Sequence, residues 1–507
     1  MTASVQSIGM GRVARGSAAN LVGAAVSACS AFALTVVVTR GLSRSEAGVF
    51  FSISSLFLLG TSLGQLGTDT GLVYFLSRCR VLGKVDQIRH YLRAAVRPVL
   101  GTALVMAAAM LLFAPELARM TNPAHAEQAT WYLRVLALFI PLAALENVAL
   151  AATRGLGSMR PNAVVEQLGR PTVQLLLVVL AVSTSGTDWL MWAWAGAYLP
   201  AAAVGWWWWV RMRRHLSPRT LPAQAGVARE FWKFTGPRSV ASVAQLVMQR
   251  LDIVLVGAMA GAVEAAVYAA ATRFIVAGQM GRNAVALAAQ PSLAEALARD
   301  DHQRAKQVFQ VSAGWLMMVT WPLFLLFSVL GEPILHVFGG GYESGTVVLL
   351  VISLSMLVAT GCGDVDSVLI MAGRTSWSLA NMLVALAINL TLDLWLIPEL
   401  GMLGAAIGWA AAIVTKNVMA LVQVAVAFRL HPFGRVSATV AGLSLTSFAL
   451  VPWLVRLASG PNWQSVAISV SVGGVVYLAG LWFLRVVLAL DSLRALRRRS
   501  PAAERQG

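Results

Sequence analysis

The chain has 507 residues, of which 58% are hydrophobic and only 12% are charged, with a mean hydropathy of +0.71. This balance excludes an ordinary soluble domain and indicates a protein that crosses a membrane many times. The formal net charge of +17 would favour nucleic acid as the partner of a soluble chain. In a membrane chain it is first a signal of topology, so no nucleic-acid partner is expected.

Apolar runs of about 20 residues, the length that spans a bilayer, recur along the whole chain. They predict an all-α integral membrane fold of about 14 transmembrane helices. Pro141 is expected to kink the fourth helix, because proline breaks the helical hydrogen-bond ladder. The predicted helices lie near residues 18–39, 47–69, 96–115, 130–151, 164–184, 188–210, 239–260, 263–287, 310–331, 345–372, 379–398, 401–428, 435–456 and 465–489.

Basic residues gather in alternate connections between these helices and in both terminal segments. The other connections hold only Arg40, Arg44, Arg119 and Arg456. Because Lys and Arg mark the cytoplasmic side, both termini are predicted to be cytoplasmic. The basic segments are then expected to contact the headgroups of membrane lipids.

Two short matches indicate an internal repeat. Residues 46–50 read EAGVF and residues 264–268 read EAAVY, and the same offset places Gln65 on Asn283. A second match relates the breaks at 157–160 and 373–376. The repeat predicts an N-lobe of six helices at 1–210, a basic cytoplasmic linker at 211–238, a C-lobe of six helices at 239–428, two further helices at 429–490 and a basic cytoplasmic tail at 491–507. Since six is even, the lobes are expected to be parallel repeats related by a pseudo-twofold axis along the membrane normal.

The stretch from Arg238 to Pro291 is the most unusual part of the chain. Its two predicted helices each carry polar residues along one face of an otherwise apolar segment. A polar stripe inside hydrocarbon is costly unless it faces water or a partner helix. It therefore predicts the wall of a wet, cation-bearing cleft, with Arg250, Arg273, Arg282, Gln245, Gln249, Gln279, Asn283 and Gln65 as cavity residues.

Other charges inside the predicted spans are expected to be paired or to face water. Four aspartates are candidates for coupling transport to a proton or a sodium ion: Asp252, Asp364, Asp366 and Asp393. Glu166 and Arg170 lie four residues apart, so a pair between them is expected. No nucleotide-binding loop, metal-ligand spacing or nucleophile motif is found. The chain is therefore expected to be neither an enzyme nor a cofactor or metal protein.

Several of these residues form a pattern that resembles polysaccharide (O-antigen and exopolysaccharide) flippases of the multidrug/oligosaccharidyl-lipid/polysaccharide exporter superfamily. The resemblance covers roughly residues 15–430. It rests on Arg40-Gly41-Leu42, Glu46-Ala47-Gly48-Val49-Phe50, Leu66-Gly67 and Gly71-Leu72 in the first half, and on Asp252, Leu255-Val256-Gly257, Tyr268-Ala269, Arg273 and Pro291 in the second.

The resemblance implies a transporter that moves an undecaprenyl-diphosphate-linked oligosaccharide across a bacterial cytoplasmic membrane by alternating access. Arg250 and Arg273 match the cationic cavity of the related lipid II flippases, although Asp252 makes this site less purely cationic. The lipid-linked oligosaccharide and other polysaccharide assembly proteins are the implied partners. The alternatives are a lipid II flippase, a cation-coupled multidrug exporter of the same superfamily, and a membrane-embedded polysaccharide polymerase or glycosyltransferase.

Overall fold

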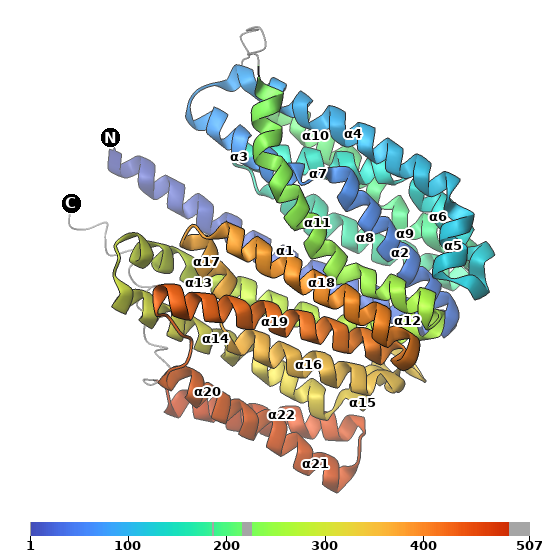
Figure 1. The fold of residues 1–507 in the computed structure, drawn as a ribbon, viewed down its shortest axis with the longest axis vertical. Coiled ribbons are helices and arrows are strands. Elements are labelled where there is room, and N and C mark those ends of the chain that lie inside the picture. The colour runs from blue at the N-terminus through green and yellow to red at the C-terminus, as the bar shows by residue number, and fades with distance from the viewer. Residues whose placement is uncertain (1, 185–186, 215–225, 486–507) are drawn as a thin grey trace. The chain divides into compact units, whose positions relative to one another are not determined.

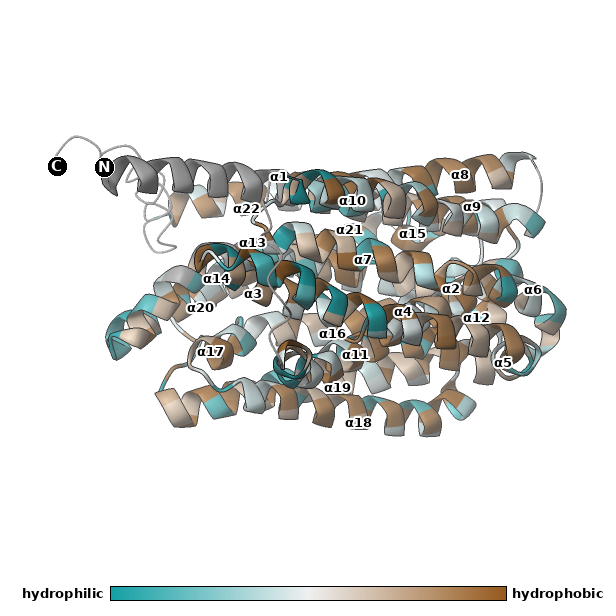
Figure 2. Cartoon of the chain, turned by 90° about the horizontal axis from the view of Figure 1, so that it is seen from above, coloured by the Kyte–Doolittle hydropathy of each residue, from teal (hydrophilic) through white to brown (hydrophobic). Residues whose placement is uncertain are grey.

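A computed structural model of the protein describes residues 2–184, 187–214 and 226–485. Within these residues the chain is helical and contains no strand. Eleven of the described helices are long and apolar enough to cross a membrane, and a bent pair of helices raises the number to twelve. The predicted all-α fold of a multi-pass membrane protein is confirmed, whereas the count of 14 spans stays a prediction. Hydrophobic residues cover most of α8 and α18, two of these helices (Figure 2).

The bent pair lies where the kink was predicted. Helix α6 (Ala126–Ala137) ends just before α7 (Ile140–Gly155), and the angle between the two segments is 40°. Pro141 lies in the first turn of α7 and has no N–H to donate to the preceding turn. The chain therefore bends there instead of continuing as one helix.

The chain forms two compact units, Met1–Ala269 and Ala270–Gly507. In the first unit, α2 packs against α4, α7 and α11, and α7 packs against α3 and α10 (Figure 1). Besides α6 and α7, its helices are α1 (Thr2–Gly41), α2 (Arg44–Gln65), α3 (Thr68–Val81), α4 (Ile88–Leu112), α5 (Ala114–Thr121), the π-helix η3 (Asn162–Gly169), α8 (Arg170–Thr184), α9 (Leu190–Gly196), α10 (Tyr198–Arg213), α11 (Val227–Met259) and most of α12 (Ala262–Thr272), with 3₁₀ turns at Val85–Gln87, Pro123–His125 and Thr187–Trp189.

In the second unit, α18 and α19 lie side by side (Figure 1), and α14 packs against α13, α16 and α20. Its helices are α13 (Ile275–Ala298), α14 (His302–Val329), α15 (Gly331–Leu335), α16 (Thr346–Gly361), α17 (Val365–Met371), α18 (Thr375–Leu400), α19 (Met402–Phe428), α20 (Arg435–Leu445), the π-helix η7 (Thr446–Leu450), α21 (Val451–Ser459) and α22 (Trp463–Phe483), with 3₁₀ turns at His336–Phe338 and Tyr342–Gly345.

The internal repeat appears in the backbone itself. Helices α2 and α12 begin at Arg44 and Ala262, which are separated by the predicted offset. At the end of α7, the N–H groups of residues 157 and 158 donate to the carbonyls of 154 and 153; at the end of α17, those of 373 and 374 donate to 370 and 369. The same pair of bonds also ends α3 and α13. Equivalent helix ends at matching positions support a duplicated helical unit.

The predicted lobe boundaries stay a prediction. Residues 215–225 of the predicted linker and the tail 491–507 lie outside the described residues. Helix α11 begins at Val227, inside the predicted linker, and belongs to the first compact unit together with Ala262–Ala269 of α12. By the repeat, α11 corresponds to α1, because the bond from residue 42 to 38 at the end of α1 recurs from 260 to 256 at the end of α11.

Helices α11 and α12 approach α2 closely at two glycines. A Cβ atom on Gly48 would lie 1.7 Å from the carbonyl oxygen of Ala262, and one on Gly257 would lie 2.5 Å from Oγ of Ser52. Small residues let helices approach this closely inside a membrane, where packing replaces the hydrophobic effect as the main attraction. The contact with Ser52 therefore places the side of α11 that carries Gly257 against α2.

Candidate functional site

The first part of the predicted cavity wall lies on α11. Gln245 and Gln249 are exposed and Arg250 is half-buried, whereas Ala244 and Met248, which each precede one of the glutamines, are buried. A helix places residues three and four apart on one face. Gln245 and Gln249 therefore share an exposed face of α11, whereas Arg250 lies about 100° around the helix from Gln249.

Asp252 occupies a different environment two residues beyond Arg250. Its side chain is only 3% exposed, and Oη of Tyr268 on α12 donates a hydrogen bond to its Oδ2 over 3.0 Å. Tyr268 is itself buried. Because a buried carboxylate is stabilised by a donor of this kind, Asp252 and Tyr268 form one polar unit inside the apolar interior. The sequence pattern contains Tyr268 but does not indicate its partner, because this contact depends on the turn between α11 and α12.

The second part of the predicted wall begins the second unit. Gln279 is half-buried, and Arg282 and Asn283 are exposed, all on α13. The packed face of α13 is marked by Gly278 and Gly281, where an added Cβ would lie less than 3.0 Å from Phe324 and Thr320 of α14. The polar residues of α13 are thus the more exposed part of this helix. Arg273 lies just before α13 and is half-buried, and Gln65, the last residue of α2 in the first unit, is also half-buried.

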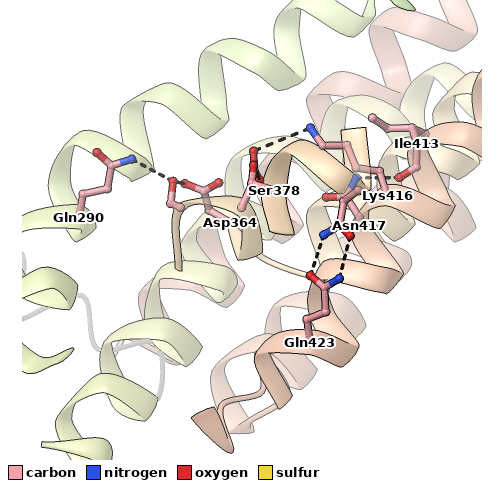
Figure 3. A network of polar contacts seen from close by, with 10 residues as sticks. Gln290, Asp364, Ser378, Ile413, Lys416, Asn417 and Gln423 are labelled. Carbon is pink, nitrogen blue, oxygen red and sulfur yellow. Dashed lines mark hydrogen bonds and ion pairs between the residues drawn. The ribbon is translucent and has the colours of Figure 1, made fainter. Parts of the chain in front are cut away.

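Two of the candidate aspartates belong to a hydrogen-bonded network in the second unit (Figure 3). Oδ2 of Asp364 accepts from Oγ of Ser367, which accepts in turn from Nε2 of Gln290 over 3.0 Å. Asp366 accepts from Oγ of Ser378 and lies 3.8 Å from Nζ of Lys416. The network therefore joins α13, α17, α18 and α19.

Next to this network, Asn381 of α18 and Gln423 of α19 exchange two hydrogen bonds of 2.8 Å each (Figure 3). Asn381 is almost fully buried, so the pair satisfies amide groups that water cannot reach. A reciprocal amide pair of this kind also sets the register between two helices. These contacts connect helices, which is the ordinary role of paired polar groups within spans.

Asp393 lies apart from the other acidic candidates. It is fully buried on α18 and accepts a hydrogen bond of 2.9 Å from Nδ2 of Asn389, one turn earlier. Fifteen residues of α18 separate Ser378, the partner of Asp366, from Asp393, which at 1.5 Å per residue is about 22 Å. A single coupling ion therefore does not contact Asp366 and Asp393 together.

The expected pair between Glu166 and Arg170 is wrong. Nε of Arg170 lies 3.5 Å from Oε1 of Glu146, and its Nη1 donates to Oη of Tyr198 over 2.9 Å. Oε2 of Glu166 instead lies 3.8 Å from Nη1 of Arg154. The reason is local: residues 162–169 form a π-helix, whose wider turn changes the rotation between neighbouring side chains. Sequence spacing alone gave no signal for this exchange of partners.

The comparison with known protein families decides the identity of the chain at family level. The sequence pattern of a family described as "Polysaccharide biosynthesis protein" matches residues 37–343. The chain belongs to this family. A search of curated proteins found none that matches.

Comparison with solved structures shows which fold this chain has. A structure of the lipid II flippase MurJ in an inward closed conformation superimposes with a TM-score of 0.70 at 13% identity, over 93% of this chain and 99% of that one. An inward-facing multidrug resistance MATE family transporter of the MOP superfamily gives 0.64 at 15% identity, over 80% and 95%. A MOP superfamily transporter from Pyrococcus furiosus gives 0.54 at 13% identity, over 82% and 95%. The chain has the fold of these transporters, and the predicted family resemblance is confirmed.

Proposed function

We propose that this protein flips an undecaprenyl-diphosphate-linked oligosaccharide from the inner to the outer leaflet of a bacterial cytoplasmic membrane by alternating access. Membership of the polysaccharide biosynthesis family, in a chain with a transporter fold, carries this proposal. The distribution of basic residues supports a cytoplasmic location of both termini. The partners are the lipid-linked sugar, the surrounding lipids and other polysaccharide assembly proteins.

The chemistry of the substrate explains the cations of the polar stripe. A diphosphate has to leave water and cross about 30 Å of hydrocarbon. Arginine suits this task, because its planar guanidinium binds phosphate oxygens in a bidentate manner and stays charged when water is removed. We assign attraction of the diphosphate to Arg250, Arg273 and Arg282.

The glutamine and asparagine side chains of the stripe have a different role in this proposal. Amides both donate and accept hydrogen bonds, which matches sugar hydroxyls. Gln65, Gln245, Gln249, Gln279 and Asn283 are therefore assigned to the glycan.

Energy coupling is assigned to Asp252. Its carboxylate is buried and has a hydroxyl donor in Tyr268. Asp364 and Asp366 have Ser367, Ser378 and Lys416 as partners, which favours a structural role for them. Asp393 remains the second candidate, because it is fully buried within a helix.

The test uses a strain that lacks the gene and is complemented with variants. Arg273→Ala should lower surface polysaccharide about tenfold or more, since a lost charged hydrogen bond is worth about 1.5–3 kcal/mol, and the lipid-linked sugar should accumulate on the cytoplasmic leaflet. Arg273→Lys keeps the charge and should restore part of the export. Arg134→Ala is the matched control, because Arg134 is exposed on α6 and lies outside the stripe. Normal export by Arg273→Ala at normal protein levels would remove Arg273 from the mechanism.

A lipid II flippase is the second candidate, favoured by the near-complete superposition on MurJ. The two functions differ in what accumulates when the gene is lost. We expect a viable deletion strain that accumulates a lipid-linked oligosaccharide. A lethal deletion with accumulated lipid II would support the second candidate.

Two other functions have simple tests. A multidrug exporter predicts that deletion sensitises cells to cationic drugs while surface polysaccharide stays normal. A polymerase or glycosyltransferase predicts that the purified protein changes the chain length or the linkage of a glycan. Neither result is expected for a flippase.

A further inference from the structure

A pocket of about 960 Å³ lies at one end of the first unit, and none of the proposed cavity residues lines it. Three connections of that unit build it: α1 to α2, α5 to α6, and α8 to α9. The topology read from the basic residues places all three on the outer side of the membrane. The described lining residues are Ser43, Ser45, Glu46, Ala124, His125, Ala126, Glu127, Gln128, Trp131, Asp188, Trp189 and Trp192.

Three tryptophans provide the aromatic surface of this pocket. Trp131 is 47% exposed and Trp189 is 63% exposed, although the nearby helices are well packed. Nε1 of Trp131 points to the backbone oxygen of Asp188 at 3.5 Å, which links the α5–α6 and α8–α9 connections. Trp192 packs edge-on against Phe139 with ring centroids 5.8 Å apart. The rings of Trp131 and Trp189 therefore present a large exposed surface, whereas the ring of Trp192 packs against Phe139.

Hydrogen-bond acceptors surround the rings. Oε2 of Glu46 accepts from the backbone N–H and the hydroxyl of Ser43, so this carboxylate is fixed in place by the cap of α2. Glu127 and Asp188 are exposed, and Gln128 donates to Tyr132 over 3.0 Å, which leaves its amide oxygen as an acceptor. Among the described lining residues, His125 is the one side chain that can carry a positive charge.

This combination selects among ligand classes. A phosphate is disfavoured by three carboxylates with one histidine. A purely apolar ligand would cover the exposed carboxylates of Glu127 and Asp188 without offering them a hydrogen bond. A sugar satisfies both parts of the pocket: its C–H face packs on an aromatic ring, and its hydroxyls donate to carboxylate and amide oxygens. The volume also lies within the range of small-molecule sites and holds several sugar rings.

We propose that this pocket, formed by Trp131, Trp189 and Trp192 with Glu46, Glu127 and Asp188, binds the glycan of the transported lipid-linked oligosaccharide on the outer side of the membrane. The identity of the glycan rests on the proposed function. The carboxylates repel the diphosphate, so the sugar enters the pocket while the anionic head remains outside. The pocket is then an exit site that holds a flipped glycan at the outer surface.

The test measures binding to the purified full-length protein in detergent. The probe is the soluble oligosaccharide released by mild acid from the lipid-linked sugar that accumulates in the deletion strain. Its affinity should fall about tenfold for Trp131→Ala and for Trp189→Ala, which corresponds to about 1.4 kcal/mol. Trp207→Ala is the matched control, because Trp207 is an exposed tryptophan of the same unit that does not line the pocket. Trp131→Phe keeps an aromatic face and should retain most of the affinity even if Trp131→Ala does not fold.

Several outcomes would overturn the proposal. Equal affinity of the wild type, Trp131→Ala and Trp189→Ala for the probe would exclude the aromatic surface; if Trp131→Ala does not fold, equal affinity of the wild type and Trp189→Ala is sufficient. Binding of spermidine, abolished by Glu127→Gln and Asp188→Asn, without binding of the oligosaccharide would make the pocket a cation site. A protein that exports the glycan normally but does not bind the probe would refute the pocket and leave the proposed function intact. Failure of export in the gene-deletion test would refute the proposed function instead.

Discussion

The contact between Gly48 and Ala262 gives a quantitative prediction about the approach of α12 to α2. A Cβ atom on Gly48 would lie 1.7 Å from the carbonyl oxygen of Ala262, whereas real Cβ contacts essentially never fall below 3.0 Å. Gly48→Ala therefore requires the start of α12 to move away from α2 by at least about 1.3 Å. The obstructing atom is backbone, so no side-chain rotation relieves the clash.

The expected cost follows from this geometry. Overpacking a well-packed interior typically costs about 1–3 kcal/mol, and a fixed backbone atom puts Gly48→Ala near the upper end, at about 3 kcal/mol. Gly101→Ala is the matched control. Gly101 lies inside α4 of the same unit, and nothing lies within 4 Å of its would-be Cβ. In a helix, alanine there should stabilise by about 0.5–1 kcal/mol.

The assay is thermal unfolding of the purified variants in detergent, monitored by circular dichroism. Gly48→Ala should melt several degrees below the wild type, and Gly101→Ala should melt at or slightly above it. If Gly48→Ala and Gly101→Ala have the same melting temperature, α2 and α12 do not approach each other as closely as described.

Three further predictions follow from the buried polar groups. Glu146→Gln removes one partner of the buried pair with Arg170 and should destabilise the protein by about 3 kcal/mol; an unchanged melting temperature would show that Tyr198 alone satisfies the arginine. Asn381→Ala and Gln423→Ala, measured singly and together, should show a coupling energy of about 1 kcal/mol in a double-mutant cycle, whereas additive effects would contradict the reciprocal pair. Tyr268→Phe should slow glycan export in the complemented strain while leaving protein levels normal; export at the wild-type rate would separate Tyr268 from the coupling role of Asp252.

Much of the fold follows from the chain itself. Each predicted span overlaps a helix in the described part of the chain, because about 20 apolar residues in a row can satisfy their backbone in lipid only as a helix. The kink at Pro141 was predictable because proline lacks an N–H. The repeat was also readable, since EAGVF and EAAVY mark the first turns of two equivalent helices.

The candidate site was only partly predictable. The exposed face of Gln245 and Gln249 follows from helical periodicity, which depends on local geometry alone. Asp252 looked like Asp364, Asp366 and Asp393 in the sequence, because each is an acidic residue in an apolar run. Their different partners come from separate helices, and no local pattern encodes those contacts.

The amino-acid sequence by itself determined that this protein is a polytopic helical membrane protein with an internal repeat. Hydropathy, proline positions and repeated motifs are local patterns, which can be recognised within a few helical turns. Only the tertiary structure decided which charges meet. Arg170 pairs with Glu146 rather than Glu166 because a π-helix alters the local rotation and a distant helix supplies the carboxylate. The tertiary structure also brings Trp131 and Trp189 into one pocket. These residues are 58 positions apart in the sequence, and only the packing of α5, α6, α8 and α9 places them close together.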